Sequence, residues 1–130
     1  MSNPSRGDGW IDQSIMHDPE NGQYGNCMQA CIASYLHRPL DDVPHFHHDG
    51  CAAEVFWDRV EDWLDNNNLT LRYGKRVGTF SIVLGPSVRG TNHCVIMSGD
   101  HVIWDPHPSR AGLIEESNRF YLLPNDPAQK

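Results

Sequence analysis

Cys27 stands at a position where a thiol side chain can act as a nucleophile. Gly25 and Asn26 precede the segment CMQACIASYLH, whose apolar side chains recur at helical spacing, so a helix is predicted to begin at Cys27. The free N–H groups and the dipole at a helix N-terminus stabilise negative charge, and they favour a thiolate there. The competing interpretation of Cys27 is a small apolar packing residue. Cys31, one turn further along the same face, is the better candidate for a core thiol.

A nucleophilic thiol needs a base and a group that orients the base, and the segment NHCVIMSGDHVIWDPHP contains both. The segment is predicted to form a β-hairpin. A three-residue turn, Ser98 to Asp100, places His93 opposite Asp105, whose carboxylate can then hold one imidazole nitrogen protonated. A two-residue turn pairs His93 with Pro106 instead and requires a bulge. The competing interpretations are a surface strand residue for His93 and a turn former for Asp105.

Two helices followed by about five strands predict an α+β fold with an antiparallel sheet. The first helix is expected at 27–37, with Asn26 as its N-cap, and the second at 52–66. The strands are expected at LTLRY (69–73), TFSIVLG (79–85), HCVIMS (93–98), HVIW (101–104) and RFYLLP (119–124). A length of 130 residues indicates a single domain, 1–130, in which residues 1–24 form a coil lying on the core.

The charge and the cysteine content limit the function classes. The chain has 10 Lys and Arg against 17 Asp and Glu, a net charge of −7 at pH 7, which excludes the electrostatic footprint of a binder of nucleic acid or of an anionic membrane. The chain shows no signal peptide and no apolar run long enough to span a bilayer, so a cytoplasmic protein is expected. Because thiols stay reduced in that compartment, the four cysteines are expected to be free thiols or metal ligands and not to form disulfides.

The segment His45-Phe46-His47-His48-Asp49-Gly50-Cys51 offers a competing kind of site. Its imidazoles and its thiol are zinc ligands, but a structural zinc site normally combines two spaced ligand pairs. A second pair is present only if Cys94 or His101 joins from the sheet. The expectation is therefore a protein without a metal or other cofactor, and the alternative is a zinc site at His45, His47, His48 and Cys51. A polar loop that borders a substrate cleft is the simpler interpretation of the segment.

The two anchor segments, GNCMQACIASYLHRPLDDVPHF and NHCVIMSGDHVIWDPHP, together resemble the papain-like cysteine peptidases. Within that superfamily the chain is most similar to the small stand-alone proteins of bacteria and phages that are related to bacteriocin-leader peptidases. The resemblance covers 22–113. It implies a nucleophile helix packed on an antiparallel sheet and the hydrolysis of an amide through a thioester. Cys27 matches the nucleophile, His93 the general base and Asp105 the orienting acid.

The resemblance is less complete at the oxyanion hole, the set of donors that binds the negatively charged oxygen of the reaction intermediate. A Gln shortly before the nucleophile supplies a side-chain donor in the family. Gln23 is the candidate here and Asn21 the alternative, with the backbone N–H of Cys27 as second donor. Trp104 and His107, which flank Asp105 in sequence, are candidate substrate-cleft residues.

These observations together predict a cysteine-dependent hydrolase that cleaves an amide, peptide or isopeptide bond. The expected partner is a polypeptide or another amide substrate, and for a phage protein it would be a host protein. The acidic face of the second helix favours basic or neutral polypeptides. Two alternatives remain: a catalytically weak papain-like fold that binds a peptide or protein, and a zinc-binding module that uses the His45–Cys51 loop.

Overall fold

The structure is a computed structural model that describes residues 9–75 and 78–125. In chain order its elements are η1 (Pro19–Asn21), α1 (Cys27–Leu36), η2 (Leu40–Asp42), α2 (Ala53–Asn66), β1 (Leu69–Tyr73), β2 (Ser81–Pro86), β3 (Asn92–Ser98), β4 (His101–Trp104) and β5 (Asn118–Pro124). The strands form one antiparallel sheet in the order β1-β5-β2-β3-β4. The predicted α+β class, with two helices and a five-stranded antiparallel sheet, is confirmed.

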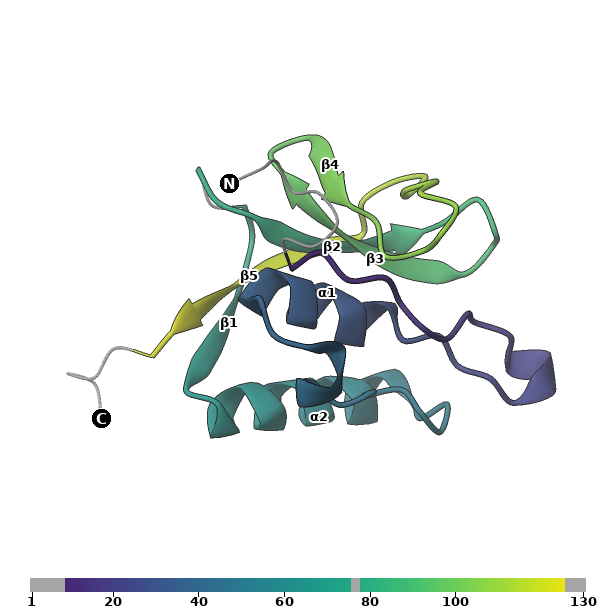
Figure 1. Cartoon of the computed structure of the whole chain (residues 1–130), viewed down its shortest axis with the longest axis horizontal. Coiled ribbons are helices and arrows are strands. Elements are labelled where there is room, and N and C mark those ends of the chain that lie inside the picture. Colours follow the sequence, from purple (N-terminus) through teal and green to yellow (C-terminus); the bar gives the residue numbers. More distant parts are fainter. Residues whose placement is uncertain (1–8, 76–77, 126–130) are drawn as a thin grey trace.

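Helix α1 is the most deeply buried element. Every residue from Met28 to Ser34 is buried, as expected of a helix that is covered on all sides. In Figure 1 both helices lie on the same side of the sheet, with α1 against β3 and α2 against β1. Helix α1 ends one residue earlier than predicted, because His37 adopts a left-handed conformation (φ 57°) and caps the last turn through its backbone N–H. Cys27 is thereby fixed at the start of a rigid helix.

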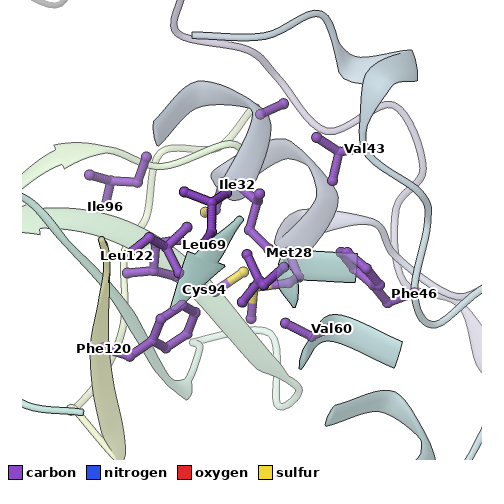
Figure 2. Close-up of a cluster of buried hydrophobic side chains, with 14 of the residues drawn as sticks. Met28, Ile32, Val43, Phe46, Val60, Leu69, Cys94, Ile96, Phe120 and Leu122 are labelled. Carbon is purple, nitrogen blue, oxygen red and sulfur yellow. The ribbon is translucent and has the colours of Figure 1, made fainter. Parts of the chain in front are cut away.

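A single apolar core joins the helices to the sheet (Figure 2). Cys31 and Ile32 of α1 are fully buried, and they belong to one cluster with Val60 and Leu64 of α2 and Phe120 of β5. Figure 2 shows Cys94 of β3 among the labelled side chains of this cluster. Because tightly packed apolar groups resist displacement, the core holds the start of α1 and the start of β3 in a fixed relation.

The β3–β4 hairpin corrects one prediction. Ser98 pairs with His101 across a two-residue turn, so the three-residue turn predicted there is wrong. The register then shifts between Met97 and Ile96, which leaves Ile103 as an extra residue on β4. This is the bulge that the two-residue alternative required. The remaining strands begin or end within two residues of their predicted bounds.

An extended N-terminal segment lies over the core and is held by Asn26. The Asn26 side chain accepts hydrogen bonds from the backbone N–H groups of Ser14 (3.0 Å) and Ile15 (2.9 Å), and it donates to the side chains of Ser14 and Gln29. Contrary to the prediction, the Asn26 side chain does not cap α1. It anchors the segment before the helix instead. The coil predicted at 1–24 agrees with this arrangement from residue 9 onward, and its first eight residues lie outside the described residues.

Candidate active site

His93 and Asp105 form a buried hydrogen-bonded pair. His93 is the second residue of β3, and Asp105 directly follows β4. The His93 Nε2 and Asp105 Oδ1 atoms are 2.7 Å apart, and both side chains are almost fully buried. The same carboxylate accepts the backbone N–H groups of His107 (2.9 Å) and Gly112 (2.7 Å). Three donors around one buried carboxylate fix its position and stabilise its negative charge.

The pair changes the pKa values of both partners. Burial acts to lower the pKa of His93, but the hydrogen bonds to Asp105 and Cys27 outweigh burial and raise it to about 9. Burial acts to raise the pKa of Asp105, but the hydrogen bonds from His93, His107 and Gly112 outweigh burial and lower it. At neutral pH the buried pair is therefore an imidazolium and a carboxylate.

The Cys27 side chain contacts His93 from the other side. Cys27 is half-buried at the first turn of α1, and its thiol lies close enough to His93 and Cys94 for both side chains to act on its pKa. Since the Nε2 atom of His93 faces Asp105, its Nδ1 atom is the one available to Cys27. The fold thus brings together Cys27 from α1, His93 from β3 and Asp105 from the loop after β4, with a hydrogen bond between His93 and Asp105 and the Cys27 thiol beside the imidazole.

The electrostatic environment of Cys27 differs from the one predicted. The hydrogen bond with Cys94 and the burial of the thiol raise the pKa of Cys27 well above its ordinary value, and the hydrogen bond with His93 opposes them. The helix N-terminus therefore does not by itself produce a thiolate. At neutral pH the resting pair is a thiol beside an imidazolium, and loss of one proton from the pair creates its reactive form.

A pocket of about 570 Å³ adjoins Cys27 and His93. Cys27 and His93 line it, together with Gly25 and Asn26 before the helix and Asn92 on β3. The opposite wall comes from the segment after η2 and from α2, and it includes Phe46, His47, Cys51, Phe56 and Trp57. A pocket of this size admits several residues of an extended peptide or a small molecule.

The structure places the two predicted oxyanion donors elsewhere. Gln23 and Asn21 are exposed, and neither lines the pocket. The Gln23 amide donates to the Met16 carbonyl (2.6 Å), and the Asn21 amide donates to the Asp18 carboxylate (2.7 Å). Both side chains stabilise the local turn around η1, so the assignment of either one to the oxyanion hole is corrected.

Gln13 supplies a buried side-chain amide to the pocket that was not predicted from the sequence. It is 5% exposed and lines the pocket with Cys27. Its backbone N–H donates to the Pro106 carbonyl (3.0 Å), which ties it to the residue after Asp105. One side-chain N–H bonds the Ile15 carbonyl (2.8 Å), and a second remains on the same nitrogen. Because Gln13 lies in the coil before α1, no periodicity could have singled it out.

The two predicted cleft residues have different positions. His107 lines the pocket, with its ring centroid 6.0 Å from that of His93. Trp104 is a buried core residue that packs against Trp10, and its indole N–H donates to the Ile11 carbonyl (2.8 Å). Trp104 therefore holds the N-terminal segment against the sheet, and its assignment to the cleft is corrected.

The loop that offered a zinc site is instead held by hydrogen bonds. His45 Nε2 bonds the Tyr24 carbonyl (2.7 Å) and His47 Nε2 bonds the Cys51 carbonyl (3.2 Å). Among residues 9–75 and 78–125, no group of three or more His, Cys, Asp or Glu side chains has the arrangement of a metal site. The loop forms part of the pocket wall, in agreement with the simpler interpretation.

Comparison of the chain with protein-family models, with curated proteins and with solved structures finds no match. In the described part of the chain, no helix combines the length and the apolar character needed to cross a bilayer.

The raised pKa of His93 predicts the pH dependence of thiol reactivity. Because the reactive form arises when the thiol–imidazolium pair loses one proton, alkylation of Cys27 by iodoacetamide should increase with pH, with a midpoint near 9. Asp105→Asn removes a group that raises the pKa of His93, so the midpoint should move to lower pH. Peptide mass spectrometry of quenched samples measures both profiles. A Cys27 rate that is constant from neutral pH upward would contradict the assignment.

Proposed function

We propose that this protein is a cysteine-dependent hydrolase of amide or peptide bonds. The observation that carries the proposal is the buried hydrogen bond between His93 and Asp105, with the Cys27 thiol beside His93 in the lining of one pocket. A thiol, an imidazole and a buried carboxylate in this order form a nucleophile, its base and the group that orients the base.

The mechanism begins when the pair has lost one proton. His93 takes the proton from the Cys27 Sγ atom, and the thiolate attacks the substrate carbonyl carbon to form a tetrahedral intermediate. The intermediate collapses as the C–N bond breaks, and the His93 imidazolium donates its proton to the departing amine. Water then transfers a proton to His93 and attacks the thioester carbon. The C–S bond breaks, the acid is released, and the proton returns from His93 to the thiol.

Two donors are available for the oxyanion. The backbone N–H of Cys27 is free because it lies at the start of α1, where the first N–H groups have no partner within the helix. The side-chain amide of Gln13 lines the same pocket and has one N–H left after its bond to Ile15. We assign these two groups to the oxyanion hole, and Gln13 replaces the earlier candidates Gln23 and Asn21.

The resemblance in sequence to the papain-like cysteine peptidases supports the proposal. The nucleophile begins a buried helix, and the base and acid come from the sheet and follow in the order Cys, His, Asp. We therefore place the chain in that superfamily, near the bacteriocin-leader peptidases, with a polypeptide substrate.

The raised pKa of Cys27 favours a second candidate function. A thiol that stays protonated at neutral pH reacts slowly, so the same pocket could bind a peptide or a protein without cleaving it. The two functions differ in one observable property. Only the hydrolase transfers an acyl group to Cys27 and then releases it.

Acyl transfer from p-nitrophenyl acetate tests the proposed hydrolase without knowledge of the substrate. The wild-type protein should release p-nitrophenol in a burst of about one equivalent, and the acetyl group should be found on Cys27 by mass spectrometry. His93→Ala should slow acylation by about 10²- to 10⁴-fold, because the base is lost.

Cys51→Ala is the matched control for this experiment, since it removes a half-buried thiol of the pocket wall that contacts neither His93 nor Asp105. It should keep the burst that Cys27→Ala loses. Acylation that persists in Cys27→Ala, or that ends without release of the acetyl group, would contradict the proposed hydrolase; the second of these outcomes would favour the binding function.

The assignment of Gln13 to the oxyanion hole can be tested separately. Gln13→Ala should slow acylation of Cys27 by about 10²- to 10³-fold, because a donor to the developing negative charge is lost. Alkylation by iodoacetamide forms no tetrahedral intermediate and should change far less. Gln23→Ala is the matched control and should leave both rates unchanged. An equal loss of both rates in Gln13→Ala would indicate a purely structural role.

A further inference from the structure

The pocket lining differs in charge from the rest of the protein. The chain has 17 acidic residues and a net charge of −7, yet no Asp or Glu is among the described residues that line the pocket. The acidic side chains of α2, at positions 54, 58, 61, 62 and 65, are all exposed and none of them lines it. The expectation that the acidic helix would favour a basic substrate at the cleft therefore lacks support.

Arg89 is the side chain in this lining that carries a permanent charge. It lies in the tight turn between β2 and β3, and its guanidinium donates to the hydroxyl of Ser109 (3.1 Å). Ser109 follows Asp105 in the loop that carries His107. None of the ion pairs within the described residues involves Arg89, so its charge is available to a ligand.

Three histidines of the pocket lining, His17, His45 and His107, have lowered pKa values and are neutral at neutral pH. Burial, Arg89 and His93 lower the pKa of His107, and its Nδ1 atom accepts the backbone N–H of Ser109 (3.0 Å). Burial and His47 lower the pKa of His17, whose Nδ1 atom accepts the backbone N–H of Gly25 (3.1 Å). Burial likewise lowers the pKa of His45.

His93 and Arg89 line the same pocket, so one substrate can contact both. His107 also lines it, and its ring centroid lies 6.0 Å from that of His93. The buried carboxylate beside His93 belongs to Asp105, and its oxygens are already bound by His93 and by two backbone N–H groups. A ligand carboxylate in the pocket would therefore find Arg89 with no acidic side chain among the described lining residues to compete for it.

We propose that the pocket selects a substrate with a carboxylate close to the scissile amide, and that the guanidinium of Arg89 binds this carboxylate. An Arg guanidinium binds a carboxylate through two parallel N–H donors, which fixes the orientation of the substrate as well as its charge. The inference rests on the proposed function. The carboxylate comes from an acidic side chain or from a free C-terminus of the substrate.

Two alkylating agents of nearly equal size test the inference at Cys27 itself. Iodoacetate carries a carboxylate where iodoacetamide carries an amide. The ratio of the iodoacetate rate to the iodoacetamide rate at Cys27 is measured first in the wild-type protein. Arg89→Gln should lower this ratio about fivefold, the effect of losing one exposed ion pair. Arg89→Lys should retain part of it.

Arg72→Gln provides the matched control, because it removes one exposed positive charge on β1 and changes the net charge by the same amount. It should leave the ratio at Cys27 unchanged. A ratio at Cys27 that is the same in Arg89→Gln as in the wild-type protein, or that falls equally in Arg72→Gln, would overturn the inference.

Protection of Cys27 from iodoacetamide identifies the source of the carboxylate. The probes are acetyl-Ala-Glu-Ala-amide, acetyl-Ala-Gln-Ala with a free C-terminus, and the neutral acetyl-Ala-Gln-Ala-amide. Protection by one of the two charged peptides that is lost in Arg89→Gln supports the inference and names the source. Equal protection by the neutral peptide, or no protection by any of the three, contradicts it.

The two proposals fail in different ways. A Cys27 that p-nitrophenyl acetate does not acylate, but whose alkylation ratio still depends on Arg89, contradicts the hydrolase and leaves the carboxylate site in place. An acylated Cys27 with a ratio that is independent of Arg89 contradicts the carboxylate site alone.

Discussion

The buried pair of His93 and Asp105 is the interaction on which the rest of the site depends. A carboxylate with almost no exposure is unfavourable unless its oxygens are bound, and here the imidazole and two backbone N–H groups bind them. The loop after β4 therefore folds back around Asp105 as far as Gly112. The same pair holds the imidazole in the one orientation that leaves Nδ1 for Cys27. The orientation and the protonation of the base thus depend on this one hydrogen bond.

The same arrangement raises the pKa of the Cys27 thiol. A thiol at the start of a helix is normally activated, but the packing that brings α1 against β3 also buries it beside Cys94. Activation therefore depends on the exchange of a proton with His93. In the proposed mechanism, the substrate carbonyl lies between the backbone N–H of Cys27 and the amide of Gln13, and Arg89 orients the substrate.

Much of the fold could be predicted from the sequence because local patterns determine it. Both helices and all five strands follow from apolar periodicity and from turn residues. The pairing of His93 with Asp105 was also predicted, although the predicted turn was one residue too long. The bulge at Ile103 shifts the register of β4 by one residue, which returns Asp105 to the face of the hairpin that carries His93. Periodicity cannot specify such compensation.

The parts of the site that could not be predicted lie in irregular segments. Gln13 reaches the pocket because Asn26 holds the backbone of Ser14 and Ile15 and because Gln13 bonds Pro106, and these contacts span long stretches of sequence. Gln23 is nearer to Cys27 in sequence, but its amide serves the turn at Met16. Trp104 adjoins Asp105, yet it faces Trp10 in the core. In irregular segments, nearness in sequence to Cys27 or Asp105 does not predict which side chains line the pocket.

The most direct test of the account is the ring nitrogen chemical shift of His93 as a function of pH, measured by NMR in the wild-type protein and in Asp105→Asn. The account predicts that His93 stays charged through neutral pH and titrates near 9 in the wild-type protein, and that it titrates at distinctly lower pH in the variant. Titration of His93 near its ordinary value of about 6.5 in both proteins would contradict the account, because the buried carboxylate would then not control the base.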